Sequence, residues 1–136
     1  MFAVAGRTRA GVRWTIVCAT QYGVTMINDD VLATHRQELR RGSVVLACLL
    51  VLRRPDYGYA LLESLDARGF AVDANTLYPL LRRLEAQGLL TSEWNTEESR
   101  PRKFYSTSDD GTALADLLSR DWQQLQSAFA SLKDES

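Results

Sequence analysis

Five cationic side chains fall in two short stretches of this sequence, and clustered cations can neutralise the phosphates of nucleic acid. Arg82 and Arg83 form the first cluster, and Arg100, Arg102 and Lys103 fall within four residues in the second. A pair of arginines on a helix more often only faces solvent, and two glutamates beside the second cluster weaken the basic signal. The cations therefore point to DNA contact without establishing it.

Short or rigid hydrogen-bonding groups precede the first cluster. They are Asn75, Thr76 and Tyr78, followed by Pro79. Such groups suit phosphate oxygens and base edges. Taken with the cations, they favour a DNA-contacting surface over a merely solvated one.

The reactive side chains argue against an enzyme or a metal site. His35 has no second histidine or cysteine pair with which to share a metal, and Cys18 and Cys48 are too few for a disulfide scaffold. The sequence shows no Ser/His/Asp set and no phosphate-cradling glycine loop. We expect no catalytic residue, no metal and no cofactor.

Composition indicates one soluble globular domain. The chain has 136 residues, of which 46% are apolar and 24% charged, and its net charge of −1 gives no electrostatic argument for nucleic acid. The longest apolar run, residues 44–52, is far shorter than the roughly 20 residues that cross a bilayer. We expect a cytoplasmic protein without a membrane partner.

Hydrophobic periodicity predicts the elements that position these side chains. A first helix is expected over residues 29–54, polar as far as Arg41 and apolar beyond it, and Pro55 ends it. Gly42 and Ser43 either interrupt this helix or admit another backbone closely, and the sequence leaves both readings open.

A second helix is predicted over residues 57–68, with Asp56 as its N-cap and Gly69 as its C-terminal cap. Its inward face carries small and apolar residues at helical spacing, namely Gly58, Leu61, Leu62 and Leu65. Residues 70–72 are a linker.

A third helix is predicted over residues 73–87, with Gly88 at its end. Its inward face carries Leu77, Leu80, Leu81 and Leu84. Its outward face would carry the polar residues 75–79 and the first cation pair. Because Pro79 lacks an N–H and fits best near the first turn, this helix should start near Asn75.

Two alternating runs, residues 90–95 and 103–107, predict a hairpin with the second cation cluster at its tip. Ser108 is a natural N-cap for a final helix with acidic residues in its first turn.

The final helix carries an apolar seam with spacings of four and three residues, typical of helices that pack against each other. The seam consists of Leu118, Trp122, Leu125, Phe129 and Leu132. It could face the domain's own core. Because three helices already close that core, we favour a partner helix from a second copy of the chain.

Residues 1–28 precede the periodic sequence and carry three arginines before a short apolar patch. We expect a disordered extension there, or a start codon assigned too early. Residues 29–107 would form the DNA-binding domain, and residues 108–136 the dimerisation helix.

Three helices followed by a hairpin predict a mainly α fold with a small β-hairpin, a winged helix-turn-helix plus a C-terminal dimerisation helix. From residue 36 to about residue 132 the chain resembles the PadR family of transcriptional regulators. The matching stretches are RRGSVVLACLLVL, PDYGYALLESL, DANTLYPLLRRLEAQGLL and SRPRKFYSTSDDG. The short final helix resembles the subfamily with a minimal C-terminal element.

The resemblance implies a homodimeric repressor that binds a palindromic DNA operator until an effector loosens it. The family's DNA-reading helix maps onto Asn75, Thr76, Tyr78, Pro79, Arg82 and Arg83, and its wing onto Arg100, Arg102 and Lys103. Tyr57 and Tyr59 match its YGY motif, and for both we leave packing and phosphate contact open.

Some relatives stack flat aromatic compounds on a tryptophan of the last helix. Trp122 matches that tryptophan, and Val45 would line the same cavity, so a small aromatic effector is a further expectation. The alternative to DNA binding is a winged helix used as a protein-interaction module, because fold does not fix function.

Overall fold

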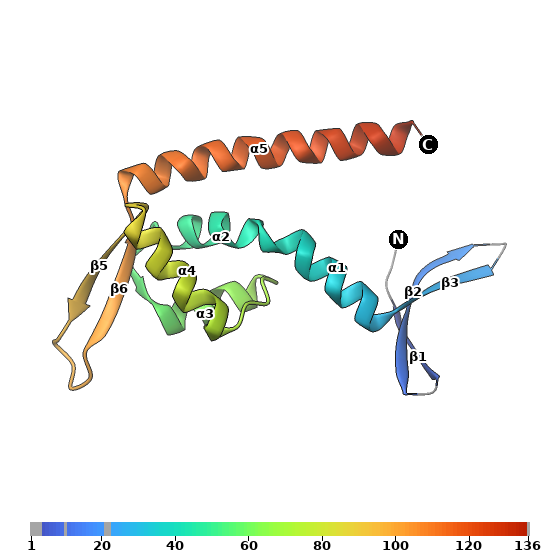
Figure 1. Ribbon diagram of the computed structural model, residues 1–136, viewed down its shortest axis with the longest axis horizontal. Helices are drawn as coiled ribbons and strands as arrows, with labels where there is room; N and C mark the ends of the chain where they lie inside the picture. The colour runs from blue at the N-terminus through green and yellow to red at the C-terminus, as the bar shows by residue number, and fades with distance from the viewer. Residues whose placement is uncertain (1–3, 10, 21–22, 136) are drawn as a thin grey trace. The chain divides into compact units, whose positions relative to one another are not determined.

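The computed structural model describes the backbone of residues 4–9, 11–20 and 23–135 and the side chains from residue 26 to residue 135. The chain forms two compact units, Met1–Gly42 and Ser43–Ser136, whose elements are labelled in Figure 1.

The first unit holds a three-stranded antiparallel sheet and a helix. Its strands β1 (Val4–Arg9), β2 (Val12–Thr20) and β3 (Gly23–Asn28) pair in that order, and α1 (Asp29–Arg41) follows. The Oδ1 atom of Asn28 caps α1 by accepting a hydrogen bond from the Asp30 amide at 2.8 Å.

The sheet differs from the disordered extension predicted over residues 1–28. Part of that prediction, at residues 1–3, 10 and 21–22, lies outside the described residues. The other residues form strands because stretches such as Val12–Thr20 are rich in β-branched side chains that favour pairing. The prediction gave weight to the arginines in this region and missed the strand signal.

The helix predicted over residues 29–54 is two helices, α1 and α2 (Ser43–Val51). Gly42 caps the end of α1. This glycine therefore interrupts the predicted helix, which was one of the two readings left open for it. The last turn of the prediction, Leu52–Arg54, lies beyond α2.

The second unit is a winged helix-turn-helix followed by a long helix. After α2 come β4 (Asp56–Tyr57), α3 (Gly58–Ala67) and α4 (Ala74–Ala86), then β5 (Leu90–Asn95) and β6 (Arg102–Thr107), and finally α5 (Asp109–Asp134). The strands form an antiparallel sheet in the order β4-β6-β5. The predicted hairpin is confirmed, whereas β4 was not predicted.

The core of this unit is built from leucines of α2, α3, α4 and β5, together with one leucine just beyond α2. Those with at most 2% exposure are Leu49, Leu52, Leu61, Leu65, Leu77, Leu81, Leu84 and Leu90. Cys48 lies among them, and burial raises the pKa of its thiol to about 12. This thiol is therefore a packing group that stays protonated at neutral pH.

The two glycines predicted to end helices do so, whereas the predicted N-cap of α3 is a different residue. Gly69 and Gly88 have φ values of 87° and 76°, the left-handed conformation that ends a helix, as predicted. Asp56 is not the N-cap of α3: Tyr57 holds that position, and Asp56 pairs with Tyr105 of β6. The side chain of Asp56 accepts a hydrogen bond from the Tyr57 amide instead.

No helix in the described part of the chain is both long enough and apolar enough to cross a membrane.

Candidate nucleic-acid interface

The helix α4 presents a polar face opposite its leucines. Asp73 caps it, with its Oδ1 atom 2.8 Å from the Thr76 amide nitrogen that donates to it. The helix starts at Ala74, and Pro79 lies inside it rather than in its first turn. Since proline has no N–H to donate, the backbone carbonyl of Asn75 lacks its usual partner within the helix.

Five of the six residues predicted on this face are exposed, namely Asn75, Thr76, Pro79, Arg82 and Arg83. Tyr78 is the exception, because it is half-buried and packs against the core. A Cβ atom built on Gly58 would lie 2.5 Å from Cε1 of the Tyr78 ring. Tyr78 therefore joins α4 to α3, and its ring is not an exposed part of the polar face.

The two tyrosines that flank Gly58 have different surroundings. Tyr57 is half-buried, and its ring meets that of Phe104 edge-on with 5.7 Å between centroids. The guanidinium of Arg102 lies 4.6 Å from the same ring centroid, a cation–π contact. Both contacts are packing contacts of the Tyr57 ring, and packing was one of the two readings left open for this residue.

Tyr59 is 57% exposed on the first turn of α3. A hydrogen bond with Glu63 and the charge of that carboxylate raise the pKa of the Tyr59 hydroxyl. A phosphate contact by this tyrosine stays a prediction.

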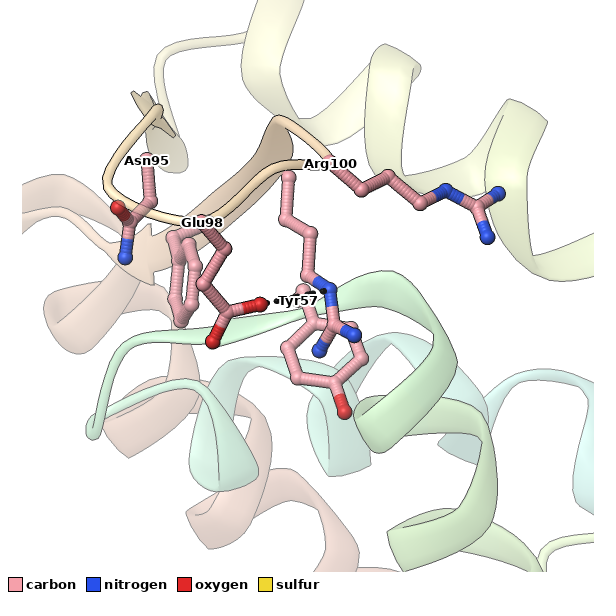
Figure 2. Close-up of a pocket in the computed structure, with 6 residues that line it drawn as sticks. Tyr57, Asn95, Glu98 and Arg100 are labelled. Carbon is pink, nitrogen blue, oxygen red and sulfur yellow. Dashed lines mark ion pairs between the residues drawn. The ribbon is translucent and has the colours of Figure 1, made fainter.

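Residues 96–101 connect β5 to β6 and form the tip of the wing, the name used below for β5, β6 and this loop. Arg100 is exposed there, and in Figure 2 its side chain extends away from the ring of Tyr57. Arg102 Nε lies 3.8 Å from Glu98 Oε2, an exposed and weak ion pair. One of the two acidic residues of the loop is thus paired with a wing arginine.

Lys103, the third predicted wing cation, turns toward α4. Its Nζ atom lies 3.1 Å from Glu85 Oε2 and 5.2 Å from the centre of the Tyr105 ring. Glu85 is the main reason why the pKa of Lys103 is raised. The side chain of Lys103 is therefore held beside the helix and not at the wing tip.

A small cavity lies between the wing and β4 (Figure 2). Its volume is about 110 Å³, and it is lined by Tyr57, Asn95, Glu98, Arg100, Arg102 and Phe104. Sites for drug-sized ligands are usually about 300 Å³ or larger. The cavity is smaller than such sites.

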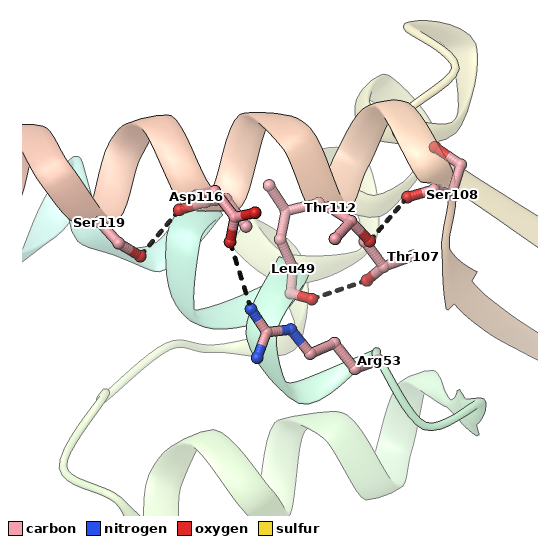
Figure 3. A network of polar contacts seen from close by, with 8 residues as sticks. Leu49, Arg53, Thr107, Ser108, Thr112, Asp116 and Ser119 are labelled. Atoms are coloured by element: carbon pink, nitrogen blue, oxygen red, sulfur yellow. Dashed lines mark hydrogen bonds and ion pairs between the residues drawn. The ribbon is translucent and has the colours of Figure 1, made fainter.

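A set of hydrogen bonds fixes the end of the wing and the start of α5 (Figure 3). Thr107 donates from Oγ1 to the Leu49 carbonyl at 2.7 Å and from its amide to the Leu52 carbonyl at 2.9 Å. Ser108 Oγ donates to the Gly88 carbonyl at 2.6 Å and accepts from the Gly111 amide at 3.0 Å. The wing, α2, the end of α4 and the first turn of α5 therefore share one anchor point.

The apolar seam of α5 is divided between the core and the surface. Ala115 is buried, and Leu118 is half-buried. Beyond them the same helix face is exposed, with fractions of 52% for Trp122, 52% for Leu125, 54% for Phe129 and 61% for Leu132. The domain's own core thus receives only the start of this face.

The proposed effector residues lie on α2 and α5. Val45 is half-buried against the core, whereas Trp122 is exposed, and neither lines the cavity of Figure 2.

Three polar or aromatic residues near the wing were not predicted from the sequence. Glu85 binds both Lys103 and the Ser92 hydroxyl, and Trp94 on β5 is 65% exposed. Strand alternation places Ser92 and Trp94 on one face of the hairpin, and this was the available signal. The sequence around Glu85 carried no such signal, because its partners Ser92 and Lys103 lie on the strands of the wing.

A winged helix whose third helix bears an exposed polar and cationic face belongs to the class of helix-turn-helix proteins. Residues 45–116, more than half of the chain, match the model of the transcriptional regulator PadR-like family. The chain belongs to this family, which confirms the resemblance drawn from the sequence. Because the family consists of transcriptional regulators, the expectation that the chain is not an enzyme is also confirmed.

Individual relatives agree with this assignment. Over 76% of its length the chain is similar to the crystal structure of a PadR family transcriptional regulator from Eggerthella lenta, with 47% identity and a TM-score of 0.73. The match covers 93% of that protein. A PadR-like regulator from Bacillus cereus, 23% identical with a TM-score of 0.64, shares the fold over 70% of this chain and 95% of its own.

A curated relative is similar over a shorter stretch. The transcriptional regulator Rv3488 of Mycobacterium tuberculosis is 42% identical over 57 residues, which are 42% of this chain. The matched stretch spans about half, 53%, of that relative's length.

Proposed function

We propose that this protein is a cytoplasmic repressor that binds a palindromic DNA operator as a homodimer. The observation that carries the proposal is the exposed polar face of α4, with Arg82 and Arg83, next to a wing that exposes Arg100. A helix with this face fits the major groove, and the wing arginine adds a phosphate contact. Membership of a family of transcriptional regulators supports the same reading.

The homodimer is supported by the exposed part of the α5 seam. Four large apolar side chains more than half exposed along one helix face are unusual on a monomer. A second copy of α5 would cover them with the same residues, as an isologous two-fold interface requires. Two-fold symmetry in turn predicts two DNA half-sites related as a palindrome.

Relief of repression by a small aromatic effector is a further part of the proposal. It rests on the resemblance and on the exposed indole of Trp122, which offers a stacking surface. Quenching of tryptophan fluorescence by a planar aromatic compound, weaker in Trp122→Phe than in the wild type, would test it.

Arg82→Ala tests DNA reading by α4. The probe is a labelled duplex recovered by selection from random sequence on the wild-type protein. We expect affinity, measured by fluorescence anisotropy, to fall by about tenfold, as loss of an arginine contact to a base or phosphate requires. Arg120→Ala, which removes another exposed arginine, from α5, is the matched control and should bind like the wild type.

Salt dependence separates this function from the alternative of a protein-interaction module. Wild-type affinity should fall steeply as salt is added, because phosphate contacts release counterions. Failure of the selection to recover any duplex, or equal binding by Arg82→Ala and the wild type at every salt concentration, would favour the alternative.

A further inference from the structure

One carboxylate of α4 is held by both strands of the wing. Ser92 Oγ on β5 donates a hydrogen bond to Glu85 Oε1 at 2.8 Å, and Lys103 Nζ on β6 lies 3.1 Å from Glu85 Oε2. The two oxygens of Glu85 are thus bound by different strands. This arrangement fixes the direction of the hairpin relative to the last turn of α4.

The Lys103–Glu85 pair is better shielded from solvent than the wing-tip pair. The Lys103 and Glu85 side chains are 29% and 32% exposed, against 41% and 67% for Arg102 and Glu98, whose charged atoms are also farther apart. The hydrogen bond from Ser92, followed by Lys103, lowers the pKa of Glu85. Both partners are therefore charged at neutral pH, and the contact is stronger than a typical surface pair.

Strand register places this contact on one face of the hairpin. Ser92 lies opposite Tyr105, and Trp94 lies opposite Lys103, so these side chains share the face turned to α4. Glu93, opposite Phe104, lies on the other face. The same strand therefore offers an acidic residue outside the network, which serves as a control below.

We propose that Glu85, Ser92 and Lys103 are positioning residues, which set the angle between α4 and the wing so that both engage DNA together. In this role Lys103 binds Glu85 and does not contact a phosphate, unlike the role that the family resemblance implies for it. The inference rests on the proposed DNA binding. It gives Glu85, which lies outside the polar face of α4, an indirect role in that binding.

Glu85→Gln distinguishes positioning from simple electrostatics. If the carboxylate only repelled DNA, its neutralisation would raise affinity, as removal of any nearby negative charge does. If it positions the wing, affinity for the selected duplex falls despite the gain in net charge. We expect a loss of about two- to fivefold, the effect of a partly shielded ion pair.

The matched control is Glu93→Gln, which makes the same charge change on β5, outside the contact with Glu85. Its affinity for the selected duplex should stay unchanged or rise slightly. The double variant Glu85→Lys with Lys103→Glu reverses the pair and should recover most of the affinity lost by either single change. Melting temperatures of all variants identify any loss that comes from unfolding.

Lys103→Gln provides the second readout. A lysine that contacts phosphate lowers the slope of log affinity against log salt by about one when it is removed. A positioning lysine leaves that slope unchanged while affinity falls.

A reduced slope for Lys103→Gln, or wild-type affinity for Glu85→Gln, would overturn the inference while leaving DNA binding intact. Absence of binding by the wild-type protein would overturn the proposed function itself.

Discussion

Gly58 lies where α3 meets the Tyr78 ring of α4, and this contact explains why a glycine separates the two tyrosines of the YGY motif. Any Cβ at this position would lie 2.5 Å from Cε1 and 3.2 Å from Cζ of the Tyr78 ring. The ring is itself held on α4 next to the buried Leu77 and Leu81 and cannot move far without disturbing the core. The glycine of the motif thus makes a packing contact between two helices.

We expect Gly58→Ala to destabilise the protein by about 1–3 kcal/mol, because the added methyl group overpacks this contact. Thermal or urea unfolding measures the change. Gly42→Ala is the control: this glycine has a helical φ of −71°, and a methyl group added to it would meet no described atom within 4 Å. Alanine there should be neutral or stabilising by up to about 1 kcal/mol. Equal losses in the two variants would contradict the packing role of Gly58.

Ser108 shows how a single residue at the start of an element ties several elements together. It caps α5 through the Gly111 amide, and it donates to the Gly88 carbonyl just beyond α4. The first turn of α5 is close to this backbone, since a Cβ on Gly111 would lie 2.1 Å from the Leu89 carbonyl oxygen. The beginning of α5 is therefore fixed on the end of α4.

Ser108→Ala should lower the free energy of unfolding by about 1–2 kcal/mol, since it removes a helix cap and a second hydrogen bond. Urea denaturation at constant slope is the appropriate measurement. Ser119→Ala, which loses only a bond to the Ala115 carbonyl within α5, should change stability by less than about 0.5 kcal/mol. An equally small effect for Ser108→Ala would show that this anchor contributes little.

Elements whose causes are local could be predicted from the sequence. Leucine spacing predicted α3 and α4, and their ends followed from Gly69 and Gly88, because a cap depends on a few neighbouring residues. The two-residue strand β4 could not be predicted, since its partner in β6 lies far along the chain. The position of Lys103 was missed for the same reason.

The second unit buries only the first part of the apolar face of α5. The start of α5 packs on the core, but the continuation of the same face carries Trp122, Leu125, Phe129 and Leu132 into solvent. A core-facing seam and a partner-facing seam were the alternatives open from the sequence, and the helix is long enough for both. Its length, 26 residues, is what leaves the second half uncovered.

Leu125→Glu should convert the proposed homodimer to monomers, because a carboxylate would be buried at the centre of the seam without a partner. Sedimentation velocity reports the change directly. Leu117→Glu is the control, since Leu117 is 56% exposed on the same helix but lies off the seam, and this variant should remain dimeric. A Leu125→Glu protein that sediments as a dimer would exclude pairing through α5.

Because Ser108 fixes the start of α5 to the end of α4, a tilt of α5 would also move α4. With 26 residues it is about 39 Å long, so a tilt of about 5° at its exposed end would displace the anchored end by about 3 Å. That displacement is close to the rise of one base pair, about 3.4 Å. In a dimer joined through the far half of α5, a small change in the crossing of the two α5 helices would change the span between the two α4 helices by a comparable amount.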